Sequence, residues 1–315
     1  MILRRLLLAA LVTSALAFGN VSSVNAQLEQ PDDLVTIFYT GDVQGAIASC
    51  GCPKLDLGGM TRRAAFLDTL RVSGWDFLTV DAGGIVPFAP MDARKWLKAE
   101  HLAKAMARVD LDAVALGYWD LAHGQEYAEK LTGWLDQPIL ATNYTLPSDK
   151  IQLEKTRQFE VKGKTVGMVA FLDPILLTEE HEWIGIEPWN KQEDLIKALS
   201  EEVDVLVALA NVADSSRMVH LAEIYPELDL IIGSHRGDLP SNVFTAGNTR
   251  MVGGGHEGKY LGRADFSFDE EGAVADMRNR YLEVLKRWGR RPWIDEVVTD
   301  FNRSVRDLLT SPEGD

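Results

Sequence analysis

The residues with the clearest chemical potential stand where apolar, strand-like segments end. These positions carry Asp42, Asp81 with Gly84, the run Tyr118, Trp119 and Asp120, then Asn211, and His235. In layered α/β proteins, ligands bind outside the carboxyl ends of the strands. Carboxylate and imidazole groups bind metal ions, whereas an indole N–H can only donate a hydrogen bond. These strand ends therefore define a candidate site for a ligand or a metal ion.

Both cysteines of the chain lie in one loop, as Cys50-Gly51-Cys52. Three interpretations stay open. The first is a local disulfide, which would be strained and easily reduced. The second is a ligand pair for a soft metal ion or cofactor, completed by His235 or His256. The third is a buried thiol pair without a role. By association, because similar Cys-Gly-Cys-Pro segments occur in bacteria rich in multihaem cytochromes, a redox protein of the cytochrome type is one candidate partner.

Apolar segments alternate with amphipathic ones along the chain, which predicts strands covered on both faces by helices. Strands are expected at 34–40, 76–84, 111–117, 135–143, 203–211 and 228–235, helices at 62–71, 94–109, 192–202, 215–226 (begun by Ser215) and 292–310 (begun by Pro292), a hairpin at 159–172, and two paired strands around a Gly-rich turn at 248–268. This pattern predicts a layered α/β domain with mixed sheets.

Composition and the first residues restrict the function further. The net charge of −15 argues against nucleic acid and anionic membranes as partners and is compatible with a basic protein partner. Residues 1–26 read as a secretory signal peptide, whose apolar stretch is too short for a membrane span. We therefore expect a periplasmic or secreted protein with an exposed segment at 27–33, one domain at 34–284, and a C-terminal helix and tail at 285–315. No membrane span is predicted.

Seven segments, in order, carry a resemblance to a known family. They are YTGDVQG, DLGGMTRRAAFLDTLR, LTVDAGG, LDAVALGYWDL, VDVLVALANVAD, LDLIIGSHRG and EGKYLGRADFSF. Together they resemble the calcineurin-like metallophosphoesterase superfamily, and within it the N-terminal domain of 5'-nucleotidases and UDP-sugar hydrolases. The resemblance implies a four-layer α/β fold, with two facing mixed sheets flanked by helices. It also implies that the second domain of full-length 5'-nucleotidases is absent.

The same resemblance implies that most ligands of the family's dinuclear metal site are replaced. Gln44, Asn211 and Gly237 stand where the family has histidines, Gly84 stands for the bridging aspartate, and Tyr118 and Trp119 stand for an asparagine and the catalytic histidine. Asp42 and His235 remain as residual metal ligands. A divalent metal is therefore expected to be reduced or absent, and no catalytic residue is assigned.

The other candidate positions have specific expectations. Asp81 is expected to be a structural carboxylate. Tyr118 and Trp119 either fill the vacated site or offer a stacking surface for a planar ligand. His256 borders the site in the family fold and could reach it. The other histidines, His181 among them, are expected to be exposed or hydrogen-bonded.

Three functional hypotheses follow. The first is an exported family member that is degenerate at the metal site and acts as a binding or partner subunit. The second is an active, nucleotidase-like phosphoester hydrolase with a rebuilt metal site. The third is a redox or cofactor module centred on Cys50 and Cys52.

Overall fold

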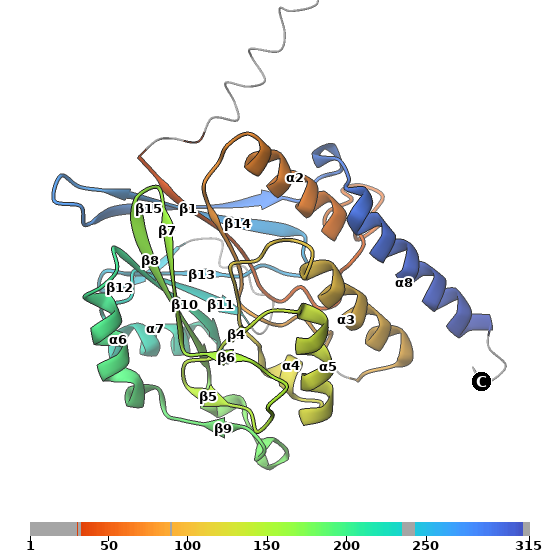
Figure 1. The fold of residues 1–315 in the computed structure, drawn as a ribbon, viewed down its shortest axis with the longest axis horizontal. Coiled ribbons are helices and arrows are strands. Elements are labelled where there is room, and N and C mark those ends of the chain that lie inside the picture. The colour runs from red at the N-terminus through yellow and green to blue at the C-terminus, as the bar shows by residue number, and fades with distance from the viewer. Residues whose placement is uncertain (1–29, 31–32, 89, 235–242, 311–315) are drawn as a thin grey trace, which may run out of the picture.

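Two mixed β-sheets face each other at the centre of the molecule (Figure 1). The computed structural model describes residues 30, 33–88, 90–234 and 243–310. The five-stranded sheet has the order β15-β14-β1-β2-β3, and the six-stranded sheet has the order β12-β13-β11-β10-β8-β7. Their strands are β1 (Val35–Thr40), β2 (Leu78–Asp81), β3 (Ala113–Val114), β7 (Thr156–Val161), β8 (Lys164–Leu172), β10 (Val205–Asn211), β11 (Leu230–Ser234), β12 (Phe244–Ala246), β13 (Thr249–Gly253), β14 (Tyr260–Phe268) and β15 (Val274–Glu283).

The inner strands are apolar along their whole length because both of their faces are covered. Every residue of β10 is buried, and β10 runs parallel to both β8 and β11. One apolar cluster fills the space between the sheets and includes Ile37, Val80, Val207 and Phe266. This packing explains why continuous apolar runs, rather than alternating ones, mark these strands in the sequence.

Helices cover the outer face of each sheet and complete the four predicted layers. The principal helices are α2 (Met60–Val72), α3 (Ala93–Met106), α5 (Gln125–Leu135), α6 (Glu193–Ser200), α7 (Ser215–Ile224) and α8 (Pro292–Thr310). Helices α2, α3 and α8 lie on the side of the five-stranded sheet, and α6 and α7 lie on the side of the six-stranded sheet (Figure 1). The predicted fold class is confirmed.

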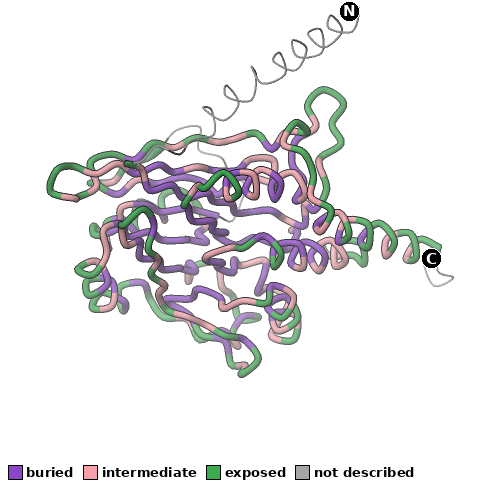
Figure 2. The backbone as a smooth tube through the Cα atoms, turned by 45° about the horizontal axis from the view of Figure 1, so that its top comes forward, coloured by how far each residue is buried: buried purple, intermediate pink, exposed green. Residues whose placement is uncertain are grey.

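Helix α8 packs against α3, and its buried residues lie in its first ten positions. Its buried residues are Ile294, Val297 and Phe301, and the end of the helix is largely exposed where it projects from the body (Figure 2). Shorter elements connect these parts: α4 (Tyr118–Leu121), β4 (Ile139–Leu140), β5 (Tyr144–Thr145), β6 (Leu153–Glu154), β9 (Gly185–Ile186), η1 (Pro174–Leu176), η2 (Glu179–His181), η3 (Trp189–Gln192) and η4 (Lys286–Trp288).

The expected strand pair at 248–268 is wrong. Strand β13 pairs with β11 and β12, whereas β14 pairs with β1 and β15 in the other sheet. The Gly-rich segment 254–259 is therefore a crossing between the two sheets and not a hairpin turn. Its glycines make this crossing tight: a Cβ at Gly254 would lie 2.8 Å from the Cα of Gly41.

Three smaller expectations also need correction. The strand expected at 135–143 is reduced to β4, because Leu135 is the last residue of α5. Helix α7 is capped by Asp214, whose carboxylate accepts hydrogen bonds from the N–H groups of Ser216 and Arg217, and Ser215 is its first helical residue. Helix α5 and strand β15 were not predicted. The expected signal peptide, the segment 27–33 in large part and the final tail lie outside the described residues.

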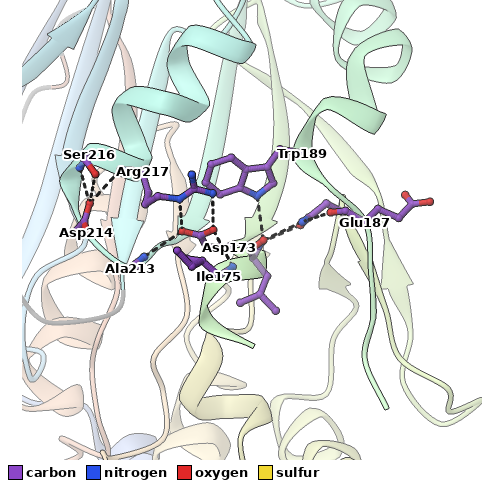
Figure 3. Close-up of polar contacts among 10 residues, drawn as sticks. Asp173, Ile175, Glu187, Trp189, Ala213, Asp214, Ser216 and Arg217 are labelled. Carbon is purple, nitrogen blue, oxygen red and sulfur yellow. Dashed lines mark hydrogen bonds and ion pairs between the residues drawn. The ribbon is translucent and has the colours of Figure 1, made fainter. Parts of the chain in front are cut away.

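A buried ion pair fastens α7 to the end of β8 (Figure 3). Arg217 donates two hydrogen bonds of 2.8 Å to the carboxylate of Asp173, whose side chain is fully buried. The guanidinium also lies 4.4 Å from the ring centroid of Trp189. Trp189 in turn donates its indole N–H to the carbonyl oxygen of Leu172, 3.1 Å away. The pair therefore holds α7, η3 and β8 together.

Replacing Arg217 should leave a buried carboxylate without its counter-ion. We expect Arg217→Met to lower the free energy of unfolding by about 3 kcal/mol, measured by urea unfolding. The control is Arg278→Met, because the Arg278 side chain is 83% exposed and lies 3.8 Å from Asp276. The control should change stability by less than about 0.5 kcal/mol. Equal losses in both variants would contradict a specific role for Arg217.

Candidate functional site

The carboxyl ends of strands from both sheets meet at one place. After β1, the N–H of Asp42 donates to the carbonyl oxygen of Gly83 at 2.8 Å. After β3, the N–H of Tyr118 donates to the side-chain oxygen of Asn211 at the end of β10, also at 2.8 Å. The predicted convergence of these strand ends is therefore present. Of the predicted residues, His235 lies outside the described part of the chain.

Asp120 organises this meeting point. Its carboxylate accepts hydrogen bonds from the backbone N–H groups of Gly84, Val86 and Gly117, at 2.8, 2.8 and 2.7 Å. The side chain is fully buried. Burial raises the pKa of Asp120 to about 6, although the three N–H bonds oppose this shift. Because its oxygens face the backbone, Asp120 positions the loops and is not directed at a ligand.

Both the oxygen and the nitrogen of the Asn211 side-chain amide make hydrogen bonds. Its oxygen accepts from Tyr118, and its Nδ2 donates to the hydroxyl of Ser234 at 2.8 Å. Ser234 then donates to the carbonyl oxygen of Ala82 at 2.6 Å. This chain of bonds joins the two sheets at their carboxyl ends. Ser234 was missed in the sequence because a serine at a strand end has no distinctive spacing.

The backbone around Gly84 leaves no room for a side chain. A Cβ on Gly84 would lie 2.5 Å from Oδ1 and 2.9 Å from the Cα of Asp42. The neighbouring Gly117 is similar, since its Cβ would lie 2.6 Å from the side-chain nitrogen of Asn211. Gly84 also has φ of +77°, and Asp42 has φ of +50°. The position expected to hold a bridging carboxylate is thus closed by direct contact between two backbone segments.

Tyr118 and Trp119 lie in a row of aromatic rings. The Trp119 ring centroid is 4.9 Å from that of Tyr118 and 5.5 Å from that of Phe88. Tyr118 also contacts the ring of His181, with centroids 5.0 Å apart. All of these residues except the buried His181 are partly exposed. Phe88 and His181 were missed because they come from loops far away in the sequence.

His181 is buried and hydrogen-bonded through one ring nitrogen. Nδ1 accepts from the N–H of Thr178 at 3.2 Å and lies 3.0 Å from its hydroxyl, so the expectation of an exposed or hydrogen-bonded histidine holds. Its Nε2 has no hydrogen-bond partner among the described residues, and the same is true of Nε2 of His123.

Asp81 lies behind the strand ends, with a buried arginine. Its carboxylate accepts hydrogen bonds from the hydroxyl of Thr40 at 2.6 Å and from the N–H of Gly83 at 3.0 Å. Arg63 of α2 donates to the same hydroxyl at 3.0 Å. Burial raises the pKa of Asp81, and the charge of Arg63 opposes this shift. These contacts support the expected structural role of Asp81.

The segment 256–259 borders Asp42 from the other side. The N–H of Glu257 donates to the carbonyl oxygen of Asp42 at 2.8 Å. Nδ1 of His256 and Nε2 of Gln44 are buried and have no hydrogen-bond partner among the described residues. Nε2 of His256 lies 3.6 Å from the carboxylate of Glu257. The backbone next to His256 therefore contacts Asp42, and the expectation that the His256 side chain reaches the site stays a prediction.

These residues do not fit the dinuclear metal site that the family resemblance implies. Within residues 30, 33–88, 90–234 and 243–310, no group of three or more His, Cys, Asp or Glu side chains could hold a metal ion. The bridging position is closed at Gly84, and the amide of Asn211 is engaged with protein groups. We therefore derive no catalytic step through a metal.

Cys50 and Cys52 lie in an exposed loop near segment 256–259. Both are free thiols, and both are exposed. The structure thus contains no disulfide between them, and the interpretation as a buried thiol pair is wrong. A metal site formed with His256 is also not found among the described residues.

Comparison with known proteins gives both sequence relatives and fold neighbours. The 5'-nucleotidase of Vibrio cholerae is 25% identical over 315 aligned residues, covering 85% of this chain and 55% of the relative. The chain thus spans about half the length of the 5'-nucleotidases it matches. No family model matches the sequence. In the described part of the chain, no helix is both long and apolar enough to cross a membrane.

The solved structures agree in fold. Sulfate thiohydrolase SoxB from Thermus thermophilus has a TM-score of 0.75 at 19% identity, covering 90% of this chain and 63% of that one. The calcineurin-like phosphoesterase YfkN from Bacillus subtilis has a TM-score of 0.70 at 17% identity, covering 88% of this chain and 99% of that one. The chain is therefore similar in sequence to the 5'-nucleotidases and has the fold of the calcineurin-like phosphoesterases.

Proposed function

We propose that this protein is an exported relative of the 5'-nucleotidases that no longer hydrolyses phosphoesters and acts as a binding or partner subunit. The observation that carries this proposal is the contact between Gly84 and Asp42. A carboxylate at position 84 has no space, because its Cβ would lie 2.5 Å from the Asp42 carboxylate. Two metal ions bridged at this position require that space.

The hydrogen bonds around the strand ends support the same proposal. The amide of Asn211, which stands for one of the family's histidines, is committed to protein partners, since it accepts from Tyr118 and donates to Ser234. A net charge of −15 favours a basic protein surface as the partner. Crosslinking in the source cells tests the partner role. If the complex dissociates when the ionic strength is raised, this would support a charged interface.

An active hydrolase with a rebuilt site is the alternative. Asp42 is kept, and the buried Nδ1 of His256 and Nε2 of Gln44 have no partner among the described residues. Unpartnered buried nitrogens are the observation that favours a ligand here. Nδ1 of His256 could bind a metal ion, whereas Nε2 of Gln44 could only donate a hydrogen bond to a bound group.

Metal content and turnover distinguish the two functions. The protein is purified without chelators, its metal content is measured by elemental analysis, and it is assayed with 5'-nucleotides and other phosphoesters in Mn²⁺, Zn²⁺ and Co²⁺. We expect no stoichiometric transition metal and no turnover above the buffer rate, for the wild type and for Asp42→Ala alike. Metal-dependent turnover that Asp42→Ala abolishes would establish the hydrolase instead.

The closed position at Gly84 can be tested by stability. We expect Gly84→Ala to lower the free energy of unfolding by about 3 kcal/mol, from the positive φ and the contact with Asp42 together. The matched control is Gly74→Ala. Gly74 follows the end of α2 with φ of +82° but has no atom within 4 Å of a Cβ, so it reports the backbone strain alone. Its cost should be about 1 kcal/mol. Equal costs in urea unfolding would mean that position 84 is open.

The buried carboxyl of Asp120 gives a pH-dependent prediction. Its folded pKa of about 6 lies above the unfolded value of 3.8, so the folded state favours the protonated form. The raised pKa contributes about 3 kcal/mol to the free energy of unfolding. This stabilisation is fully present at pH values below the unfolded pKa, and it is lost as the pH rises through the folded pKa.

The control for Asp120 is Asp120→Asn, which cannot titrate. We expect the free energy of unfolding of the wild type to fall, relative to that of Asp120→Asn, as the pH rises from about 4 to about 7. Urea unfolding at several pH values measures it. A difference independent of pH would show that Asp120 keeps an ordinary pKa.

A further inference from the structure

The loop that carries the two cysteines is held in a defined conformation. Ser49 and Gly58 form a β-bridge at its base, and the N–H of Cys50 donates to the carbonyl oxygen of Leu57 at 2.8 Å. Within the loop, Gly51 takes φ of +67°, and a Cβ there would meet no atom within 4 Å. The turn that brings the two cysteines together therefore uses the conformational freedom of glycine without crowding.

Asp56 anchors the loop from inside. Its carboxylate accepts hydrogen bonds from the N–H of Gly51 at 2.8 Å and from the hydroxyl of Ser49 at 3.1 Å. Arg62 of α2 donates to this carboxylate at 2.5 Å and to the Asp56 carbonyl oxygen at 2.7 Å. The bond from Arg62 is the main reason that the pKa of Asp56 is lowered to about 2. The loop is thus fixed to α2 through a charged group.

The two thiols interact with each other and are not equivalent. A hydrogen bond between their side chains lowers the pKa of Cys50 and raises that of Cys52. Backbone N–H groups of Cys52 and Leu57 lower the pKa of Cys50 further. These shifts make Cys50 the better thiolate of the two, although its Sγ also lies 3.6 Å from the carbonyl oxygen of Leu55, to which the protonated thiol donates. Such a division matches an attacking and a resolving thiol.

Lys259 brings a positive charge to the same place from another part of the chain. Its pKa is raised, chiefly by its 2.6 Å bond to Glu257 and additionally by the negative potential of Cys50 and Cys52. The segments are in contact, since a Cβ on Gly58 would lie 3.3 Å from the carbonyl oxygen of Gly258. A cation beside a thiol favours the thiolate.

We propose that Cys50 and Cys52 form a thiol–disulfide exchange site whose substrate is an exposed disulfide. The Cys50 thiolate attacks one sulfur of the substrate disulfide, forms a mixed disulfide and releases one substrate thiolate. Cys52 then loses its proton to solvent and attacks Cys50, which releases the second substrate thiolate. The protein loses two electrons and closes a Cys50–Cys52 disulfide, and the substrate disulfide gains them as two thiols. Two exposed thiols, separated by one glycine in a loop that is held at its base, carry this site. The proposal does not depend on the function proposed for the strand ends.

Single cysteine variants test the order of events. The wild type, Cys50→Ser and Cys52→Ser are reduced and mixed with glutathione disulfide, and intact mass and released thiol are followed in time. We expect Cys52→Ser to accumulate the glutathione adduct roughly tenfold faster than Cys50→Ser. Because the Cys50–Cys52 disulfide is strained and easily reduced, glutathione disulfide is added in large excess, and the wild type should then release both glutathione thiols and retain no adduct. Both cysteines are exposed, so circular dichroism should find all three variants folded.

A second set of reactions identifies the source of the substrate and the role of Lys259. A synthetic peptide closed by one disulfide replaces glutathione disulfide, and faster exchange with the peptide would identify a protein disulfide as the substrate. Lys259→Gln should slow the attack by Cys50 a few-fold. Equal, slow adduct formation in both cysteine variants, or an adduct on the wild type that does not resolve, would overturn the proposal.

Discussion

The contact between the backbone segments at Asp42 and Gly84 constrains everything else at the strand ends. Because a Cβ at position 84 would come within 2.9 Å of the Asp42 Cα, the loops after β1 and β2 lie against each other without a side chain between them. The N–H of Gln44 donates to the carbonyl oxygen of Gly84 at 2.9 Å, so the contact is hydrogen-bonded as well as close. Loops that would surround ions in a metal site are instead packed directly together.

Two sets of hydrogen bonds fix the loops around this contact, and together they form a rigid centre at the strand ends. Asp120 binds three N–H groups of the loops after β2 and β3, and Ser234 connects the six-stranded sheet to the carbonyl oxygen of Ala82. Buried polar groups with all their bonds made within the protein specify one arrangement of the chain. The centre therefore performs a structural task that is separate from any ligand the neighbouring aromatic rings could bind.

The sequence predicted the layers of this fold well, because runs such as 203–211 and the amphipathic helix 292–310 carry strong local patterns. It failed where pairing is decided at long range. The local sequence pattern does not show whether β13 and β14 pair with each other or belong to different sheets. The strand ends could be located from the resemblance, but the closure at Gly84, the role of Ser234 and the position of His181 depend on contacts between distant segments. His235 lies outside the described residues, so its prediction stays a prediction.

The pairing of β1 with β14 also governs the order in which the chain can fold. Val35 lies opposite Phe266, and Tyr39 lies opposite Gly262, so the first strand of the domain needs a partner made more than two hundred residues later. Contacts this distant slow folding, because the loop between them must be closed before they contribute. Until β14 is available, one edge of β1 is open to pairing with other chains. A chaperone that keeps the chain unfolded would protect this edge while synthesis is completed.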